Sequence, residues 1–257
     1  MTRSPLVHTT ELAARLGAVA AVCDVVGTKH LSPSLTEVTL RGNALALTGQ
    51  PGNDVMVLVG GNDEHIVRRR YSVRQVASER DEFTLWVTTG HDGDGARWAK
   101  SATPGDQVDV IGPRGKILLA EDVDWHLFMG DVSSLATFYR MTESISTPSK
   151  VLFVVEIAHP EDALTTQLAD VVAVTGVFVD RAERAPNDPA GLLSGLAALT
   201  LPAGRGHAYL FGEFAVIRAL LRPLADQGVE SADVSSKAFW RAGRPNAAHG
   251  EPVKSED

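Results

Sequence analysis

The pattern of apolar segments in this chain changes near residue 120. Up to that point, short β-type segments recur between turn residues, at 21–26, 35–40, 55–59, 71–76, 83–88 and 107–111. Six such strands with little helix between them are typical of a small antiparallel barrel. Beyond residue 120, apolar segments alternate with helical ones, which is typical of a doubly wound parallel sheet. The sequence therefore predicts an antiparallel barrel over residues 1–120 and an α/β domain over residues 121–257.

The elements of the second half can be placed approximately. Its strands are expected at 125–129, 151–157, 171–179, 208–211 and 234–239. Its helices are expected at 133–144, 161–168, 190–199 and 213–227. Near the N-terminus, residues 12–22 place Leu12, Leu16 and Val19 on one helical face, which predicts a short amphipathic helix before the first strand.

Charge and cysteine content exclude several classes of protein. The net charge of −8 over 257 residues argues against nucleic acid as the main partner. A single cysteine, Cys23, excludes an intramolecular disulfide and any cysteine-rich metal or iron–sulfur site. The eight histidines have no zinc-type spacing, so no metal site is expected. The apolar runs are too short to span a bilayer, and we expect a cytoplasmic protein.

The segment Arg69-Arg70-Tyr71-Ser72-Val73-Arg74 carries side chains suited to a flavin dinucleotide. Because side chains alternate along a strand, Arg69 and Tyr71 are expected to point the same way. The guanidinium of Arg69 can fork onto a pyrophosphate, and Tyr71 can lie against a flat ring. Ser72 points to the other face, where its hydroxyl or backbone N–H can reach a ring nitrogen.

Further motifs follow in order along the chain. Gly95-Ala96 stands just before a short helix, where small residues let backbone N–H groups approach phosphate oxygens. Gly112-Pro113-Arg114-Gly115 comes next, and Gly130-Asp131 follows an expected strand. Gly212-Glu213 precedes a helix, and Ala238-Phe239-Trp240-Arg241 lies near the C-terminus.

This ordered set of motifs resembles the siderophore-interacting protein family, which comprises FAD-dependent ferric-siderophore reductases of the ferredoxin-reductase-like superfamily. The resemblance implies that the barrel binds FAD and that the α/β domain receives NADH or NADPH. The FAD contacts that it implies in the barrel are Arg69, Tyr71, Ser72, Val73, Arg74, Gly95, Ala96 and Trp98. In the second domain, Asp131, Gly212 and Glu213 follow strands at whose carboxyl ends such sheets bind ligands. Phe239 and Trp240 match the family's C-terminal aromatic pair, which packs near the flavin.

The resemblance also implies a substrate, a ferric siderophore whose iron is released as iron(II) after reduction. The iron would be cargo, and we expect no protein ligands for it. Candidate contacts for an anionic chelate are Arg68, Arg70, Lys237, Arg241 and Arg244.

Two departures from the family pattern leave alternatives open. Asp94 stands where proline is usual, and a carboxylate beside a pyrophosphate is unfavourable unless it points away. The loop Gly130–Thr137 keeps the family's glycine, aspartate and leucine but loses glutamate, threonine, alanine and proline. FAD binding is therefore the firmer expectation, and the electron donor is NADH, NADPH or a ferredoxin. The alternatives are a flavoenzyme acting on an organic small molecule in a biosynthetic pathway and a non-catalytic binder of flavin or siderophore.

Overall fold

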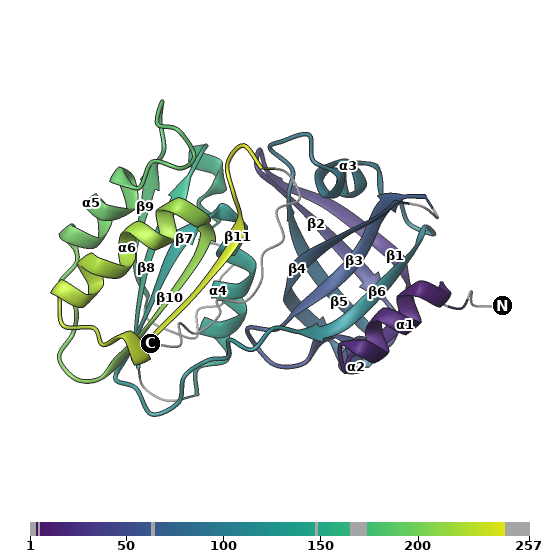
Figure 1. The fold of residues 1–257 in the computed structure, drawn as a ribbon, viewed down its shortest axis with the longest axis horizontal. Coiled ribbons are helices and arrows are strands. Elements are labelled where there is room, and N and C mark those ends of the chain that lie inside the picture. The colour runs from purple at the N-terminus through teal and green to yellow at the C-terminus, as the bar shows by residue number, and fades with distance from the viewer. Residues whose placement is uncertain (1–3, 5, 63–64, 147–148, 165–173, 245–257) are drawn as a thin grey trace. The chain divides into compact units, whose positions relative to one another are not determined.

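The computed structural model describes residues 4, 6–62, 65–146, 149–164 and 174–244 (Figure 1). The chain divides into two compact units. The first comprises Met1–Leu118 with Tyr139–Met141, and the second comprises Leu119–Phe138 with Thr142–Asp257.

The first unit contains a closed barrel of six antiparallel strands, as the sequence predicts. Its strands are β1 (Val19–Ser32), β2 (Leu35–Arg41), β3 (Asp54–Gly61), β4 (Ile66–Ala77), β5 (Glu82–Thr88) and β6 (Gln107–Arg114). They are arranged around the barrel in the order β1-β2-β5-β4-β3-β6. Closure leaves no unpaired sheet edge within the barrel.

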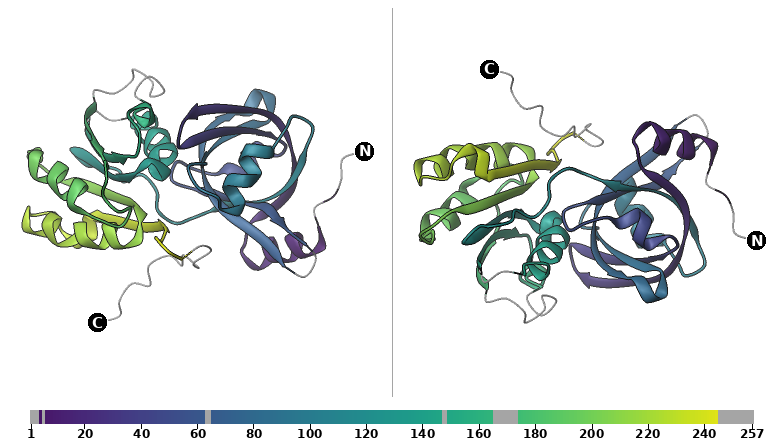
Figure 2. Two further views of the ribbon diagram at one scale, coloured as in Figure 1. Left: turned by 90° about the horizontal axis from the view of Figure 1, so that it is seen from above. Right: turned by 90° about the horizontal axis from the view of Figure 1, so that it is seen from below.

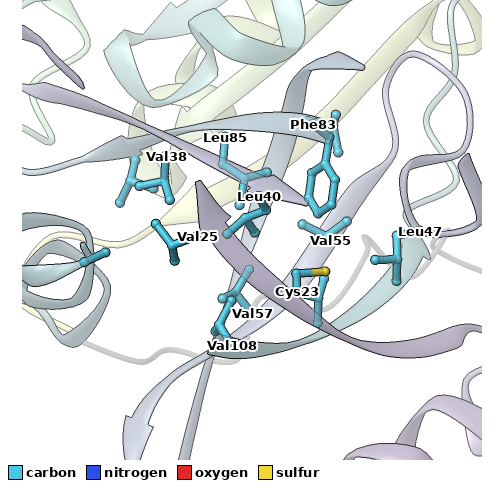
Figure 3. Packing of buried hydrophobic residues seen from close by; sticks show 14 of the residues in the cluster. Cys23, Val25, Val38, Leu40, Leu47, Val55, Val57, Phe83, Leu85 and Val108 are labelled. Carbon is cyan, nitrogen blue, oxygen red and sulfur yellow. The ribbon is translucent and has the colours of Figure 1, made fainter. Parts of the chain in front are cut away.

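Alternate residues of these strands fill the barrel with branched apolar side chains (Figure 3). The buried set includes Val25, Val38, Leu40, Val55, Val57, Phe83, Leu85 and Val108. Cys23 lies in this core, and its thiol donates a hydrogen bond to the carbonyl oxygen of Gly42. Burial raises the pKa of Cys23 to about 12, so the thiol stays protonated near neutral pH.

In the described part of the chain, three α-helices accompany the barrel: α1 (Val7–Arg15), α2 (Ala44–Thr48) and α3 (Asp94–Ser101). The expected helix at residues 12–22 is wrong in position, because α1 ends at Arg15 and β1 begins at Val19. Gly17 adopts φ +61° and the amide of Ala18 returns to the carbonyl of Ala13, which ends the helix. Val19 then pairs with Gly112 of β6, so sheet pairing overrides the helical periodicity of this segment.

The second unit contains a five-stranded parallel sheet in the order β11-β10-β7-β8-β9. Its strands are β7 (Trp125–Asp131), β8 (Lys150–Ile157), β9 (Val174–Asp180), β10 (Gly206–Glu213) and β11 (Val234–Trp240). Its α-helices are α4 (Leu135–Glu143), α5 (Ala190–Ala198) and α6 (Phe214–Asp226). The chain thus follows the predicted strand–helix alternation.

Helices cover both faces of this sheet (Figure 2). On one face, Leu192 and Leu196 of α5 and Ile217 of α6 pack with apolar residues of the strands. On the other face, Phe138 of α4 lies 5.2 Å from Phe128 of β7, measured between ring centroids. None of the helices in the described ranges is long and apolar enough to cross a membrane.

One expected helix is only partly testable. At residues 161–168 the structure has a single 3₁₀ turn, Pro160–Asp162, and residues 165–173 lie outside the described part of the chain. The start of the strand expected at 171–179 falls in the same gap, and β9 is described from Val174 onward.

Candidate functional site

Arg69 and Tyr71 meet at the first turn of α3. A Cβ built on Gly95 would lie 2.0 Å from the Tyr71 hydroxyl oxygen and 3.4 Å from Cγ of Arg69. Both side chains therefore point toward this glycine, as the alternation along β4 predicts. Gly95 makes room for them, because any larger residue would collide with the tyrosine.

The ring of Tyr71, on β4, is held by an aromatic partner on α3. It stacks on Trp98 with 5.9 Å between the ring centroids and 24° between the planes. Burial is the main cause that raises the pKa of the Tyr71 phenol well above its usual range. The hydroxyl thus stays protonated and can donate a hydrogen bond.

Arg69 is engaged by an acidic side chain. Its Nη2 lies 2.9 Å from Oδ2 of Asp94, the first residue of α3, and its Nη1 donates to the carbonyl oxygen of Arg68. Asp94 also pairs with Arg97 one turn along the helix. The hydrogen bond from Arg69 is the main cause that lowers the pKa of Asp94, so this carboxylate is ionised at neutral pH.

The start of α3 supplies a second set of donors. Its first intrahelical hydrogen bond runs from the amide of Arg97 to the carbonyl of Gly93, so the amides of Asp94, Gly95 and Ala96 precede it. Such first-turn amides are the donors that bind phosphates at helix N-termini. Together with the guanidinium of Arg69 and the ring of Tyr71, they fit the pyrophosphate and an aromatic ring of FAD.

The side chains of Arg68, Arg70 and Arg74 contact groups other than Gly95 and α3. Arg70 forks onto Asp54 with two hydrogen bonds of 2.8 and 2.7 Å, and Arg68 donates to the hydroxyl of Thr9 on α1. Arg74 is 1% exposed, and its guanidinium lies 5.1 Å from the centroid of the Trp86 ring.

Of the predicted flavin contacts, the structure thus gathers Arg69, Tyr71, Gly95 and Trp98, with Ala96 in the same helix turn. Val73 lies in the barrel core, so only its backbone is available to a ligand. Ser72 and Arg74 alternate with Arg69, Tyr71 and Val73 along β4, so their side chains point to the opposite face of the strand. Asp54, which neutralises Arg70, was missed, because the partner of an arginine on a neighbouring strand depends on strand pairing.

In the second unit, the carboxylate of Asp131 joins three segments. Its Oδ1 accepts hydrogen bonds from the amide and hydroxyl of Ser133. Its Oδ2 accepts from the amide of Glu213 at 3.0 Å and from Nε1 of Trp240 at 2.9 Å. Burial is the main cause that raises the pKa of this carboxyl group. Asp131, Glu213 and Trp240, predicted as separate contacts, therefore form one cluster at the carboxyl end of the sheet.

Glu213 caps the next helix. Its Oε2 accepts from the amides of Ala215 and Val216, and its Oε1 accepts from the amide of Ala242. Gly212 has φ +138°, and a Cβ there would lie 2.4 Å from Oδ2 of Asp131. Glycine at this position allows the close approach of the two strand ends.

A small pocket opens beside this cluster, lined in part by Asp131, Glu213 and Glu156. Glu156, at the end of β8, forms an ion pair of 2.9 Å with Arg181 and one of 3.5 Å with Arg184. Glu156, Arg181 and Arg184 were missed, because single charged residues in or just after a strand give no distinctive motif.

The remaining residues that the sequence suggests for binding cofactor or chelate in the C-terminal segment each have a different partner or surrounding. Phe239 stacks on Phe211 with 5.2 Å between centroids, and Nζ of Lys237 lies 5.7 Å from the Phe239 ring. The guanidinium of Arg241 lies 4.7 Å from the ring of Phe214, and Arg244 is exposed.

Comparison with known proteins gives relatives that cover most or part of this chain. Ferric vibriobactin reductase ViuB of Vibrio cholerae is 25% identical over 254 residues, covering 89% of this chain and 92% of its own. The NADPH-dependent ferric-chelate reductase of Escherichia coli is 28% identical over 153 residues, 59% of this chain and 58% of its own. The crystal structure of a siderophore utilization protein from T. fusca superposes with a TM-score of 0.77 at 23% identity, covering 90% of this chain and 96% of that one.

Family-specific patterns match both units. The pattern described as the siderophore-interacting FAD-binding domain matches residues 57–117, which include β4 and α3. The pattern described as siderophore-interacting protein matches residues 123–243, which include Asp131, Glu213 and Trp240. The chain therefore belongs to the siderophore-interacting protein family, and its barrel corresponds to that family's FAD-binding domain.

Proposed function

We propose that the protein is an FAD-dependent reductase that passes electrons from NADH or NADPH to a ferric siderophore and releases iron(II). The observation that carries this proposal is the meeting of Arg69 and Tyr71 at Gly95, in front of the first-turn amides of α3. Guanidinium, amides and a half-buried phenol form a donor set suited to a flavin dinucleotide. The names of the Vibrio and Escherichia relatives support ferric chelates as the substrate class.

In this proposal the protein binds and orients, and the bound cofactor supplies the redox chemistry. When bound, FAD would supply hydride acceptance and single-electron transfer, which suits an iron(III) acceptor. Arg69 and the start of α3 would hold its phosphates, and Tyr71, which stacks on Trp98, would lie against one of its aromatic rings. No acid–base pair is needed for electron transfer to iron.

Contacts with the anionic chelate are proposed for the exposed arginines. Arg241 and Arg244 are exposed, whereas the charge of Arg70 is offset by Asp54. Arg68 is partly buried, and Lys237 is 9% exposed. We therefore assign chelate binding to Arg241 and Arg244 ahead of the other three.

The bonding of Asp131 favours a second candidate for the electron donor. Both carboxylate oxygens already accept two hydrogen bonds each, and Trp240 is one of the donors. A nicotinamide dinucleotide at this strand end has to contact other groups or displace Trp240. A ferredoxin needs only a docking surface for single electrons, and it is the alternative donor.

Anaerobic stopped-flow spectroscopy tests the proposal. The flavin-loaded protein is mixed with NADH or NADPH, and flavin absorbance is followed; a ferric siderophore is then added with a chelator that traps iron(II). We expect rapid bleaching by one nucleotide and recovery on addition of the ferric chelate, with iron(II) trapped. Bleaching by reduced ferredoxin alone would assign the donor to that protein. Bleaching without reoxidation by any ferric chelate would contradict the proposed substrate and favour an organic one.

A further inference from the structure

An acidic side chain lies among the groups that suit the flavin pyrophosphate. Asp94 is the first residue of α3, and its Oδ2 is 2.9 Å from Nη2 of Arg69. The two side chains are 29% and 26% exposed, so the pair is partly shielded from water. The guanidinium that faces the start of α3 therefore already has an anionic partner.

A pyrophosphate arriving at this place meets a like charge. Asp94 is ionised at neutral pH, because Arg69 and Arg97 both lower the pKa of its carboxyl group. Like charges repel more strongly in a partly buried site than in bulk water. Binding of the phosphates thus requires Arg69 to leave Asp94 or to share its donors with two anions.

We propose that Asp94 competes with the pyrophosphate of FAD for Arg69, so that this chain binds FAD less tightly than it would without that carboxylate. The inference rests on the proposed function only in taking FAD as the ligand of Arg69 and Tyr71. The cost of the competition falls on the phosphates and leaves the isoalloxazine ring untouched. Asp94 is therefore a residue that determines how strongly the dinucleotide is held relative to riboflavin, which carries the ring without phosphate.

Two substitutions remove the charge in different ways. Asp94→Asn keeps the size of the side chain and leaves Arg69 without an ionic partner. Asp94→Ala removes the side-chain oxygens and keeps the amide of residue 94, which is one of the first-turn donors of α3. Asp92→Asn is the matched control, because Asp92 is an exposed carboxylate two residues away in the same loop. Circular dichroism and thermal unfolding establish that all three variants are folded.

The experiment measures flavin binding by the full-length protein after bound flavin has been removed. FAD and riboflavin are titrated by calorimetry and by flavin fluorescence, at low and high ionic strength. We expect Asp94→Asn and Asp94→Ala to lower the Kd for FAD about fivefold, the effect of one partly exposed ion pair. The Kd for riboflavin stays unchanged in both variants, and Asp92→Asn changes the Kd for FAD by less than about twofold.

Each contrary outcome has a defined meaning. Weaker FAD binding by Asp94→Asn would overturn the inference, because Asp94 would then hold Arg69 in place for the phosphate. Equal gains for riboflavin, or an equal gain in Asp92→Asn, would also overturn it. Equally tight FAD binding by the wild type and the Asp94 variants refutes this inference and leaves the proposed function standing. Failure of every protein to bind any flavin refutes the proposed function together with it.

Discussion

The hydroxyl oxygen of Tyr71 lies where the Cβ of any residue other than glycine at position 95 would need to be, with 2.0 Å between the two positions. The strand that carries Tyr71 and the helix that begins beside Gly95 are thus fitted to one another at a single point. The same point is where the first-turn amides of α3 begin.

Substitution of Gly95 by alanine should therefore disable the flavin site. The added methyl group has to displace Tyr71 or α3, and we expect the Kd for FAD to rise by at least about tenfold, the equivalent of about 1.4 kcal/mol. Gly60→Ala is the control, because nothing lies within 4 Å of a Cβ at that position. Titration with FAD measures both. Normal FAD affinity in Gly95→Ala would show that Tyr71 is not a cofactor contact.

The cluster at Asp131 should behave as a unit in unfolding experiments. Asp131→Asn leaves the amide of Glu213 or the indole of Trp240 without its acceptor, and we expect a loss of about 1–3 kcal/mol in the free energy of unfolding. Trp240→Phe removes one donor and costs about 1 kcal/mol. Urea unfolding of both single variants and of the double variant measures the coupling. Strictly additive losses would contradict the hydrogen bond of 2.9 Å between the two side chains.

Acid should destabilise the protein through His126. This histidine is 2% exposed, and burial first, then His207, lowers its pKa to about 4. In the unfolded chain a histidine binds its proton near pH 6.5. Because the unfolded state takes up the proton first, stability is lost as the pH falls from about 6.5 to about 4, by up to about 3 kcal/mol.

Unfolding free energies measured between pH 4 and 8 test this dependence. His126→Phe removes the titrating group while keeping a ring beside Phe128 and Tyr209, whose centroids lie 6.2 and 6.1 Å from that of His126. We expect a shallower decline in acid for the variant. His207, whose pKa burial also lowers, accounts for part of the decline that remains. An identical decline in the wild type and His126→Phe would exclude His126 as its source.

The arginines proposed for chelate binding should separate into two classes. Arg70→Ala removes the two hydrogen bonds that Asp54, which is 4% exposed, accepts from that guanidinium, and we expect a loss of about 2–3 kcal/mol in stability. Arg241→Ala removes an exposed side chain, with less than about 1 kcal/mol lost. If Arg241 binds the chelate, its variant raises KM for the ferric siderophore and leaves kcat nearly unchanged. Steady-state kinetics and thermal unfolding distinguish the two effects.

Local patterns predicted the parts of this fold whose partners are close in sequence. The alternation along β4 correctly put Arg69 and Tyr71 on one face, because it depends only on the geometry of an extended strand. Helix α2 was not anticipated, since its start is fixed by Asp81, whose carboxylate accepts from the amides of Asn43 and Ala44.

Contacts between distant segments account for most of what the sequence did not provide. Asp131 and Trp240 are 109 residues apart, and no periodicity relates an aspartate after one strand to an indole on another. The pairing of Glu156 with Arg181 likewise exists only because β8 and β9 are neighbours in the sheet. The sequence motifs identified some residues of these clusters, such as Asp131 and Trp240, but did not predict which residues they would contact.

Strand β4 carries arginines at three successive positions, 68, 69 and 70, and this has a consequence for how its register is specified. If the strand slid by one residue so that Arg68 took the place of Arg69, an arginine would still stand opposite Asp94 and another opposite Asp54. Charge alone therefore does not distinguish the correct pairing from the slipped one. The distinction comes from Val73, which this slip would turn out of the barrel core while Ser72 took its place. Single substitutions among the three arginines should therefore leave the register of β4 intact, as long as position 73 stays apolar.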